Sequence, residues 1–517
     1  MYICGINIGH NPSLTLMKDG EIIHYNEERK LFQIKLLSGI PYKCIDEISN
    51  FKLDAVYVTS YDWIKNDLLN LKFYLQHKEM IKKETDVYSL YRPHHLGHLF
   101  KAYVDSGFEK ARVFVLDGRG SKWDDGYEYC SIYDMENLDV TCILKKLFNG
   151  FQFESNSIQE GLPLNEGVGI NDKTKFEKTK NLHLGRFYAS ISRNFNYENE
   201  EGKFMGLQSY GKIQENILKK FTEGVNEDEL KKIENNTDVA RTSQVFFEQE
   251  YLNLIRKYKY KNMVFTGGCT LNVVNNYKIQ KEFKDCNLYF EPLCGDEGNS
   301  ISSAYFHYLT KKQKLKPNNN IYLGNKIKIN ESILKNELLE NVNRKNIIDI
   351  LEKGEIVGLV QGKAEAGPRA LGNRSLLLDP SLKNAKDKMN SIKKRENFRP
   401  FACSILEENY KDYFDVADGD KSPHMMIAPQ AKNNIKIIAP SIVHVDGTCR
   451  VQTINKTDNF ELYKILQNFK IPLLMNTSLN LAGYPMVETF EDVLFTMRNS
   501  QLKYVFFADE SKLLIKT

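Results

Sequence analysis

A polar segment at residues 311–320 constrains the possible folds of this chain most, because it separates two parts that are each long enough to form a hydrophobic core. The segment reads KKQKLKPNNN and contains no run of apolar residues. Lysine, asparagine and proline in this density are typical of a linker. At 517 residues the chain also exceeds the usual size of a single hydrophobic core. We therefore expect one domain at residues 1–322 and another at residues 323–517.

Both parts show the alternation that is typical of α/β proteins. In the first part we expect strands at 2–7, 13–17, 21–25, 55–59, 112–117, 127–133 and 263–266, and helices at 243–258 and 299–310. The first three strands are joined by short turns and predict an antiparallel meander. In the second part we expect a helix at 331–340 capped by Asn330, strands at 355–360 and 471–475, and a helix at 489–499. We detect no internal sequence repeat.

Charge and cysteine content exclude several classes of protein. The 71 basic and 67 acidic residues are spread along the chain, so we expect no extended surface for nucleic acid. Nine cysteines without a CxxC pair argue against a disulfide framework and a cysteine zinc finger. The sequence shows no membrane-length apolar run and no signal-peptide pattern at its start, so we expect a cytoplasmic protein.

A histidine-rich segment predicts a metal site in the first part. In PHHLGH, His94 and His98 are four residues apart and share one face of a helix, whereas His95 points away. Asp117 follows an apolar strand and Asp296 lies in a glycine-rich turn, so both carboxylates are candidate ligands. Imidazole with carboxylate suits Fe(II) or Zn(II), and spacing does not choose between them. Alternatively, Asp296 caps a helix and the histidines lie on the surface.

Glycine-rich turns in the first part predict contacts with phosphate groups. Gly267 and Gly268 follow a strand in TGGCTLN and lead toward a helix, whose N-terminus favours anions. Asn272 closes this motif, and Gly118 lies in a similar turn after a strand. Such turns also occur for steric reasons alone where a strand meets a helix.

Arginine and lysine are concentrated in motifs of the second part. GPRALGNRS contains Arg369 and Arg374, KKRENFRP contains Lys393 and Arg395, and HVDGTCR ends at Arg450. Guanidinium groups match the paired oxygens of phosphates. A charge run alone is more often a solvated surface. Here the cations alternate with glycine, proline and aromatic residues, which favours the wall of a polyanion pocket.

Together these motifs resemble the NodU/CmcH carbamoyltransferase family over nearly the full chain. The shared motifs include HHLGH at 94–98, LDGRG at 116–120, GGCTLN at 267–272, GDEG at 295–298, GPRALGNRS at 367–375 and NTSLN at 476–480. The resemblance implies an N-terminal domain of the actin-like ATPase fold, which binds the metal and transfers the carbamoyl group. It also implies a YrdC-like C-terminal α/β domain, which makes carbamoyl-adenylate from carbamoyl phosphate and ATP with Mg(II). The acceptor would be a hydroxyl of a small molecule such as a sugar, natural product or nucleoside.

The resemblance also implies roles for individual residues. His10 would deprotonate the acceptor hydroxyl, and Lys393 and Arg369 would act in forming the adenylate. The implied metal ligands are His94, His98, Asp117 and Asp296. The implied contacts with nucleotide and carbamoyl phosphate are Arg374, Arg395, Arg450, Ser478, Asn480, Gly267, Gly268, Asn272 and Gly118.

Other functions remain compatible with these motifs. A carbamoyl-adenylate enzyme of tRNA modification shares the chemistry, although no basic stripe for RNA is evident. A hydrogenase-maturation enzyme would normally add paired CxxC zinc modules, which this sequence lacks. A regulatory nucleotide-binding protein without turnover would be favoured by loss of His10 or the histidine pair, yet all three are present. We expect loops near residues 158–180 to select the acceptor, and a homodimer remains open.

Overall fold

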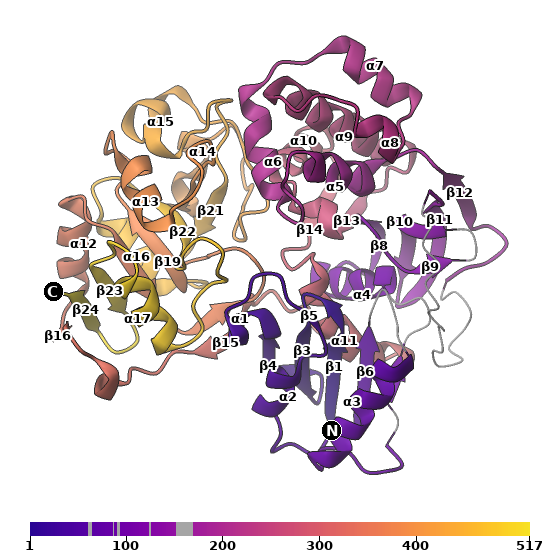
Figure 1. Ribbon diagram of the computed structural model, residues 1–517, viewed down its shortest axis with the longest axis horizontal. Coiled ribbons are helices and arrows are strands. Elements are labelled where there is room, and N and C mark those ends of the chain that lie inside the picture. The colour runs from indigo at the N-terminus through magenta and orange to yellow at the C-terminus, as the bar shows by residue number, and fades with distance from the viewer. Residues whose placement is uncertain (60–64, 86, 90–93, 124–125, 151–168) are drawn as a thin grey trace. The chain divides into compact units, whose positions relative to one another are not determined.

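The computed structural model describes residues 1–59, 65–85, 87–89, 94–123, 126–150 and 169–517. The chain forms two compact units (Figure 1). The N-terminal unit comprises Met1–Leu31, Leu36–Asn272 and Ile279–Asn320, and the C-terminal unit comprises Phe32–Lys35, Val273–Lys278 and Ile321–Thr517. The last division, between Asn320 and Ile321, follows the polar segment 311–320, which contains no helix or strand.

The first sheet of the N-terminal unit has five strands. They are β4 (Glu21–Glu27), β3 (Ser13–Lys18), β1 (Tyr2–Asn7), β6 (Ala55–Thr59) and β7 (Val87–Ser89), in this spatial order. β1 pairs antiparallel with β3, and β3 pairs antiparallel with β4. On its other side β1 pairs parallel with β6, which pairs parallel with β7. The predicted antiparallel meander is therefore confirmed.

The second sheet repeats this arrangement. Its strands are β12 (Lys175–Thr179), β11 (Asp139–Phe148), β10 (Gly126–Glu136), β8 (Lys110–Leu116), β13 (Asn262–Thr266) and β14 (Asn287–Phe290), with β9 (Lys122–Trp123) beside β10. β8 pairs antiparallel with β10 and β10 antiparallel with β11, whereas β8, β13 and β14 are parallel. Two sheets that each have three antiparallel strands followed by two parallel ones form the actin-like ATPase fold. The repeat is one of topology, so it left no repeat in the sequence.

Two helices lie between these sheets, α4 (His94–Ser106) and α11 (Asn299–Thr310). α11 packs on β1, β3 and β6, α4 packs on β8, β10 and β13, and the two helices contact each other. Gly5 permits this packing, because a Cβ atom there would lie 2.0 Å from the carbonyl oxygen of Ser300. α4 follows the strands of the first sheet in the sequence but covers the second sheet, and α11 follows the strands of the second sheet but covers the first.

The N-terminal unit has further helices outside this pair. They are α1 (Glu28–Phe32), α2 (Tyr42–Glu47), α3 (Lys65–His77), α5 (Leu184–Asn194), α6 (Glu201–Leu207), α7 (Glu215–Glu223), α8 (Glu227–Leu230) and α9 (Thr237–Lys257). The last residue of α1, Phe32, and the first part of α10 (Val273–Glu282), as far as Lys278, count with the C-terminal unit. Leu71 and Leu75 of α3 join the core of the first sheet. Phe187 and Phe246, from α5 and α9, join the core of the second. α9 starts at Thr237 and not at the predicted residue 243. Its N-cap is Asn236, whose side chain accepts a hydrogen bond from the N–H of Val239.

The C-terminal unit is built on an eight-stranded mixed sheet. Its order is β16 (Glu337–Asn341), β24 (Lys512–Lys516), β23 (Tyr504–Phe507), β17 (Val357–Val360), β19 (Arg374–Leu378), β22 (Leu473–Ser478), β20 (Ala402–Leu406) and β21 (Val451–Ile454). β15 (Tyr322–Lys326) and β18 (Lys363–Glu365) form a separate, antiparallel two-stranded sheet. The helices are α12 (Arg344–Glu352), α13 (Ala385–Lys393), α14 (Tyr410–Tyr413), α15 (Asn433–Ile438), α16 (Phe460–Asn468) and α17 (Phe490–Arg498). Leucine and isoleucine side chains of α12 and α16 pack on the sheet.

One predicted helix in this unit is wrong. Residues 331–340 form only a short 3-10 turn, Glu331–Ile333, before the edge strand β16. Asn330 accepts a hydrogen bond from the N–H of Ser332, as a cap does, but pairing of β16 with β24 prevails over helix propagation. The strands predicted at 355–360 and 471–475 and the helix at 489–499 are confirmed as β17, β22 and α17. Every helix in the described ranges is too short or too polar to cross a lipid bilayer.

Candidate functional site

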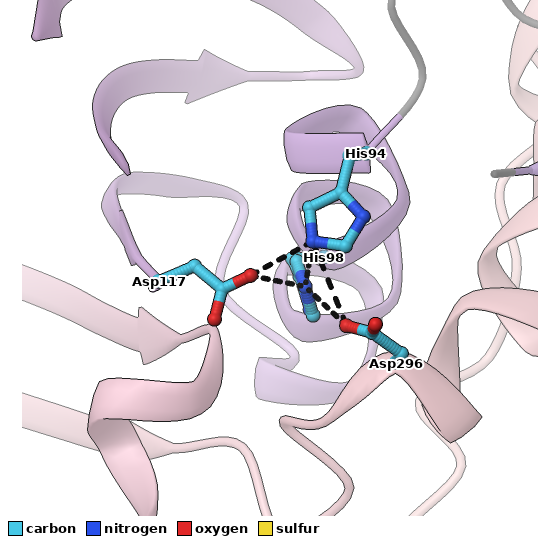
Figure 2. A group of neighbouring side chains, drawn as sticks. All are labelled: His94, His98, Asp117 and Asp296. Atoms are coloured by element: carbon cyan, nitrogen blue, oxygen red, sulfur yellow. Dashed lines mark hydrogen bonds and ion pairs between the residues drawn. The ribbon is translucent and has the colours of Figure 1, made fainter. Parts of the chain in front are cut away.

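Four side chains of the N-terminal unit point toward one another (Figure 2). His94 and His98 lie on the first turns of α4, Asp117 directly follows β8, and Asp296 begins a 3-10 turn before α11. One ligand atom from each residue lies within 4.8 Å of the other three. The structure thus brings together all four residues that the sequence indicated as metal ligands.

The distances between these atoms fit ligands of a single ion. Nε2 of His94 lies 2.8 Å from Oδ2 of Asp117 and 3.3 Å from Nε2 of His98. Oδ1 of Asp296 lies 3.5 Å from Nε2 of each histidine. Ligands about 2.1 Å from a tetrahedral ion are roughly 3.4 Å apart. Two imidazoles and two carboxylates suit Fe(II) or Zn(II).

The two carboxylates attract positive charge to this cluster. Burial alone would lower the pKa of His94, but Asp296 and Asp117 raise it to about 9. The pKa of Asp296 lies well below its usual value, because the histidines outweigh the effect of its burial. A buried group of this composition is suited to a divalent cation, which requires neutral imidazoles and ionised carboxylates.

Each carboxylate has a second contact through its other oxygen. Oδ1 of Asp117 accepts a hydrogen bond from the N–H of Gly268 at 3.1 Å. Oδ2 of Asp296 lies 3.7 Å from Nδ1 of His10. Such outer contacts orient metal ligands. The backbone N–H of Gly268, which the sequence indicated for phosphate, therefore orients a carboxylate in this structure.

His10 ends a short strand after β1, β2 (Gly9–His10), which pairs with β5 (Ser38–Gly39). The side-chain amide of Asn7 donates to the carbonyl oxygens of His10 and Asn11, at 3.0 and 3.2 Å, which fixes the backbone at the end of β2. The contact with Asp296 raises the pKa of His10. Its Nε2 atom is buried and has no hydrogen-bond partner within the described ranges. A buried nitrogen of this kind is suited to accept a hydrogen bond from a bound hydroxyl.

Two residues that sequence patterns did not indicate hold the start of α4. Oγ of Ser121 accepts from the N–H of His94 at 3.1 Å, and Oε1 of Glu128 accepts from the N–H groups of Ser121 and His95 at 3.2 and 3.4 Å. Lys145 donates to the other oxygen of Glu128. Helix caps are sought just before a helix, whereas these follow it in the chain. The ring of His95 faces Ser131, so it points away from the cluster as predicted.

The remaining turn residues of the N-terminal unit have structural contacts. Gly267 has a φ of 85°, and a Cβ atom there would lie 2.3 Å from the carbonyl oxygen of Leu116. The side-chain amides of Asn272 and Gln244 hydrogen-bond to each other. Gly118 directly follows Asp117, and a Cβ atom there would lie 3.9 Å from the carbonyl oxygen of Gly185, at ordinary van der Waals distance. Close packing therefore requires a glycine at residue 267 but not at residue 118.

In the C-terminal unit, Lys393 meets the predicted pair Ser478 and Asn480. Its Nζ atom donates to the carbonyl oxygens of Ser478 and Asn480 at 2.6 and 2.9 Å. It also lies 3.1 Å from Oγ of Ser478 and 2.5 Å from Oδ1 of Asn480. Lys393 ends α13, whereas Ser478 ends β22, so the fold brings together motifs that are far apart in the sequence.

Lys393 belongs to a group of cations, which we call the basic cluster: Arg369, Lys393, Arg395, Arg399 and Arg450. Burial and the charges of Arg395 and Arg399 hold the pKa of Lys393 well below its usual value, and Lys35 adds to this effect. Burial and Arg399 lower the pKa of Arg395 to about 9, although Glu396 opposes this. Burial, Arg369, Arg395 and Arg399 lower the pKa of Arg450 well below its usual value. Lys393 is buried and the four arginines are partly buried, and cations that repel one another in such a place favour a bound polyanion.

Arg374 has a different environment from the basic cluster. It is fully buried, and its guanidinium donates to the carbonyl oxygens of Gln361 and Asn373 at 2.8 Å each, Asn325 at 2.6 Å and Gly362 at 3.2 Å. Burial lowers its pKa, whereas Glu488 and Glu365 raise it. The structure therefore places this arginine among backbone carbonyls and carboxylates.

Comparison with known proteins decides the family. The family model described as Carbamoyltransferase N-terminus matches residues 41–236 and 226–305, and the one described as Carbamoyltransferase C-terminus matches residues 348–512. The chain belongs to the carbamoyltransferase family. It is thus an enzyme that transfers carbamoyl groups, as the motifs predicted.

Relatives of this carbamoyltransferase extend over most of its length. It is 32% identical to an uncharacterized protein, MJ1051, of Methanocaldococcus jannaschii, with 98% of each chain covered. It is 24% identical to the nodulation protein NolNO of Sinorhizobium fredii, over 95% of this chain and 77% of that protein. Among solved structures, HypF of T. kodakarensis aligns with 61% of this chain and 48% of that one, at 12% identity and a TM-score of 0.38.

Proposed function

We propose that this carbamoyltransferase acts in two steps, one in each unit. In the C-terminal unit, carbamoyl phosphate, ATP and water give carbamoyl-adenylate, phosphate and pyrophosphate. In the N-terminal unit, the carbamoyl group passes from the adenylate to a hydroxyl of a small molecule, and adenosine monophosphate leaves. This assignment treats the C-terminal unit as YrdC-like, on the strength of the K-x-R and S-x-N motifs at 393–395 and 478–480.

The mutual repulsion within the basic cluster is the observation that carries the first step. ATP and carbamoyl phosphate are both polyanions. Burial and repulsion lower the pKa values of Lys393, Arg395 and Arg450, and bound phosphates would relieve the repulsion. Arginine forks bind phosphate oxygens in pairs, and a buried lysine supplies a point charge. Arg369 and Lys393 would stabilise the charge that develops on the α-phosphate and on the leaving pyrophosphate as the adenylyl group is transferred, with Mg(II) bound to the nucleotide.

The second step requires a base and a place for the adenylate phosphate. The residues that would hold the metal are His94, His98, Asp117 and Asp296, whose atoms have the spacing of ligands. Fe(II) or Zn(II) bound there would offset the negative charge of the phosphate. Nε2 of His10 would take the proton of the acceptor hydroxyl, whose oxygen attacks the carbamoyl carbon. Asp296 would orient the ring of His10 through Nδ1.

Two other functions would use the same sites: tRNA modification, and regulation without catalysis. A tRNA-modifying enzyme would form the same adenylate but transfer its group to RNA, which the nearly balanced charge of +4 does not favour. A regulatory protein would bind nucleotide without turnover. The small-molecule acceptor is favoured because a base candidate, His10, lies next to the metal cluster.

The decisive experiment measures pyrophosphate release by the purified full-length protein. We expect release from ATP with Mg(II) only when carbamoyl phosphate is present, and no release from ATP alone. Release without carbamoyl phosphate, or none under any condition with metal-loaded protein, contradicts the proposal. Carbamoyl phosphate labelled in the carbonyl carbon, incubated with a metabolite extract and separately with total tRNA, then identifies the acceptor class by mass spectrometry.

A further inference from the structure

A single buried carboxylate organises the loop that carries Arg369. We call residues 366–373 the arginine loop. Oε1 of Glu365 accepts three backbone hydrogen bonds, from the N–H groups of Leu371 at 2.6 Å, Asn373 at 2.8 Å and Arg374 at 3.2 Å. Glu365 is fully buried in the C-terminal unit. One oxygen that collects three N–H groups folds the chain around itself, as anion-binding loops do around a phosphate.

Side chains from distant segments hold the other polar groups of the arginine loop. The carbonyl oxygen of Leu371 accepts from Nε2 of Gln452 at 2.8 Å and from the hydroxyl of Tyr322 at 2.9 Å. The carbonyl oxygen of Gly372 accepts from Nε2 of Gln361 at 2.8 Å. The N–H of Gly372 donates to Oγ of Ser375 at 2.9 Å. Consecutive backbone groups are therefore satisfied before any ligand binds.

Arg374 completes this framework with the opposite charge. Its guanidinium gathers carbonyl oxygens from the arginine loop, from the 361–362 segment and from β15, as Asn373, Gln361, Gly362 and Asn325. Glu365 collects N–H groups of the same loop. Backbone donors and acceptors are thus sorted between a buried anion and a buried cation, which keeps both charges hydrogen-bonded.

The loop presents Arg369 to the basic cluster, where its charge acts on Arg450. An unsatisfied carboxylate four residues away would repel a bound phosphate, but Glu365 is turned toward backbone N–H groups. A loop that is already ordered loses little entropy when a ligand binds.

We propose that Glu365 is a positioning residue for Arg369, and that Glu365 and Arg374 together form the framework of a preformed polyanion site rather than contacting the polyanion. This inference rests on the proposed function, since it assigns the polyanion to the first step. Arg374 then supports the loop instead of contacting the nucleotide or carbamoyl phosphate, the role that the sequence indicated for it. It adds Glu365, which no sequence motif indicated.

A double-mutant cycle on the full-length protein tests this inference. The variants are Glu365→Gln, Arg369→Ala and the double variant, with Glu352→Gln on the exposed surface of α12 as the matched control. One readout is kcat and KM for carbamoyl phosphate in pyrophosphate release. The other is calorimetric binding of inorganic pyrophosphate, which needs no turnover and so separates this inference from the proposed reaction.

Glu365→Gln should lower pyrophosphate affinity and kcat/KM by about 10- to 100-fold, because the loop shifts by a fraction of an ångström to an ångström. In the Arg369→Ala background the same substitution should have almost no further effect, since the residue through which it acts is gone. A purely structural role would instead multiply the two losses. Glu352→Gln should bind pyrophosphate as the wild type does.

Multiplying losses in the double variant, wild-type binding by Glu365→Gln, or no pyrophosphate binding by the wild type would each overturn the inference. If Glu365→Gln does not fold, Tyr322→Phe replaces it in the cycle, because it removes only the hydroxyl that contacts Leu371. The expected result is again a loss that disappears when Arg369 is alanine. An equal loss with and without Arg369 would overturn the inference.

Discussion

Nδ1 of His10 lies 3.7 Å from Oδ2 of Asp296, the oxygen other than the one nearest the histidine pair. One carboxylate is therefore shared between the proposed base and the proposed metal site. Any change that rotates Asp296 alters both. His10 and Asp296 belong to the N-terminal unit, whereas the basic cluster belongs to the C-terminal unit. Substitutions at His10 or Asp296 should therefore affect the second chemical step and not the first.

His10→Ala should leave formation of carbamoyl-adenylate intact and reduce transfer by about 10²- to 10⁴-fold, the usual contribution of a general base. Pyrophosphate release and appearance of labelled carbamoyl product are measured in the same reaction. His77→Ala, on the exposed end of α3, is the matched control and should retain both. Equal loss of both signals in His10→Ala would refute the assignment of the base.

The metal site should lose affinity in two distinguishable ways. His98→Ala removes a ligand and should abolish the visible absorption of bound Co(II). Gly268→Ala retains all four ligands, but its Cβ would lie 2.8 Å from Oδ1 of Asp117 and displace that carboxylate. We expect about a tenfold lower Co(II) affinity for Gly268→Ala, measured by spectroscopic titration. Wild-type affinity in this variant would show that the outer contact does not orient the ligand.

The protein freed of metal by a chelator should lose stability in alkali. Asp296 and Asp117 raise the pKa of His94 to about 9 from 6.5, so the folded state prefers the protonated imidazole. This contribution is fully present below pH 6.5 and disappears as the pH rises to about 9. Its size is on the order of 3 kcal/mol. Urea unfolding at pH 6 and pH 9, with and without Zn(II), checks the prediction, since Zn(II) should remove most of the difference.

Lys393→Met should separate charge from packing in the basic cluster. It keeps the apolar stem but removes one of several mutually repelling cations, so we expect at least a 100-fold loss in kcat/KM for pyrophosphate release. Relief of the repulsion should offset the lost hydrogen bonds, so the melting temperature should change little. Lys394→Met, at the exposed neighbouring residue, should keep full activity. A large fall in melting temperature for Lys393→Met would mean that its main role is structural.

Gly5→Ala tests the contact between the first sheet and α11. Its Cβ would lie 2.0 Å from the carbonyl oxygen of Ser300 and 2.6 Å from the nitrogen of Ala304, both of which are backbone atoms. We expect the free energy of unfolding to fall by about 3 kcal/mol or more. Gly202→Ala in α6 meets no atom within 4 Å and should be neutral or raise stability by about 0.5–1 kcal/mol. Similar melting temperatures for both variants would contradict this packing.

Local patterns predicted elements well where one signal dominated. The i, i+4 spacing of His94 and His98 and the apolar strand before Asp117 depend only on neighbouring residues, and they led to the cluster in Figure 2. The helix prediction at 331–340 failed because β16 is stabilised by β24, whose paired residues are 171 to 179 positions away, and no local periodicity reveals such a partner. Contacts between distant segments decide such cases.

Buried polar residues of the framework were missed for a similar reason. Glu365 and Glu128 each lie in or next to a β-rich segment, where a lone glutamate has no distinctive spacing. Their importance comes from backbone N–H groups that the fold brings to them. Arg374, conversely, lies in a motif with Arg369, yet Arg369 acts on Arg450 of the basic cluster, whereas Arg374 lies among backbone carbonyls and carboxylates. Motif membership alone does not separate these two arginines.

The exchange of helices between the two sheets has a consequence for synthesis on the ribosome. The strands of the first sheet are complete at Ser89, but the helix that covers its inner face, α11, is not made until residue 310. Translation at about 5–20 residues per second leaves that apolar face without its helix for roughly 10–45 s. The nascent chain therefore completes this core only after almost the whole N-terminal unit has left the exit tunnel.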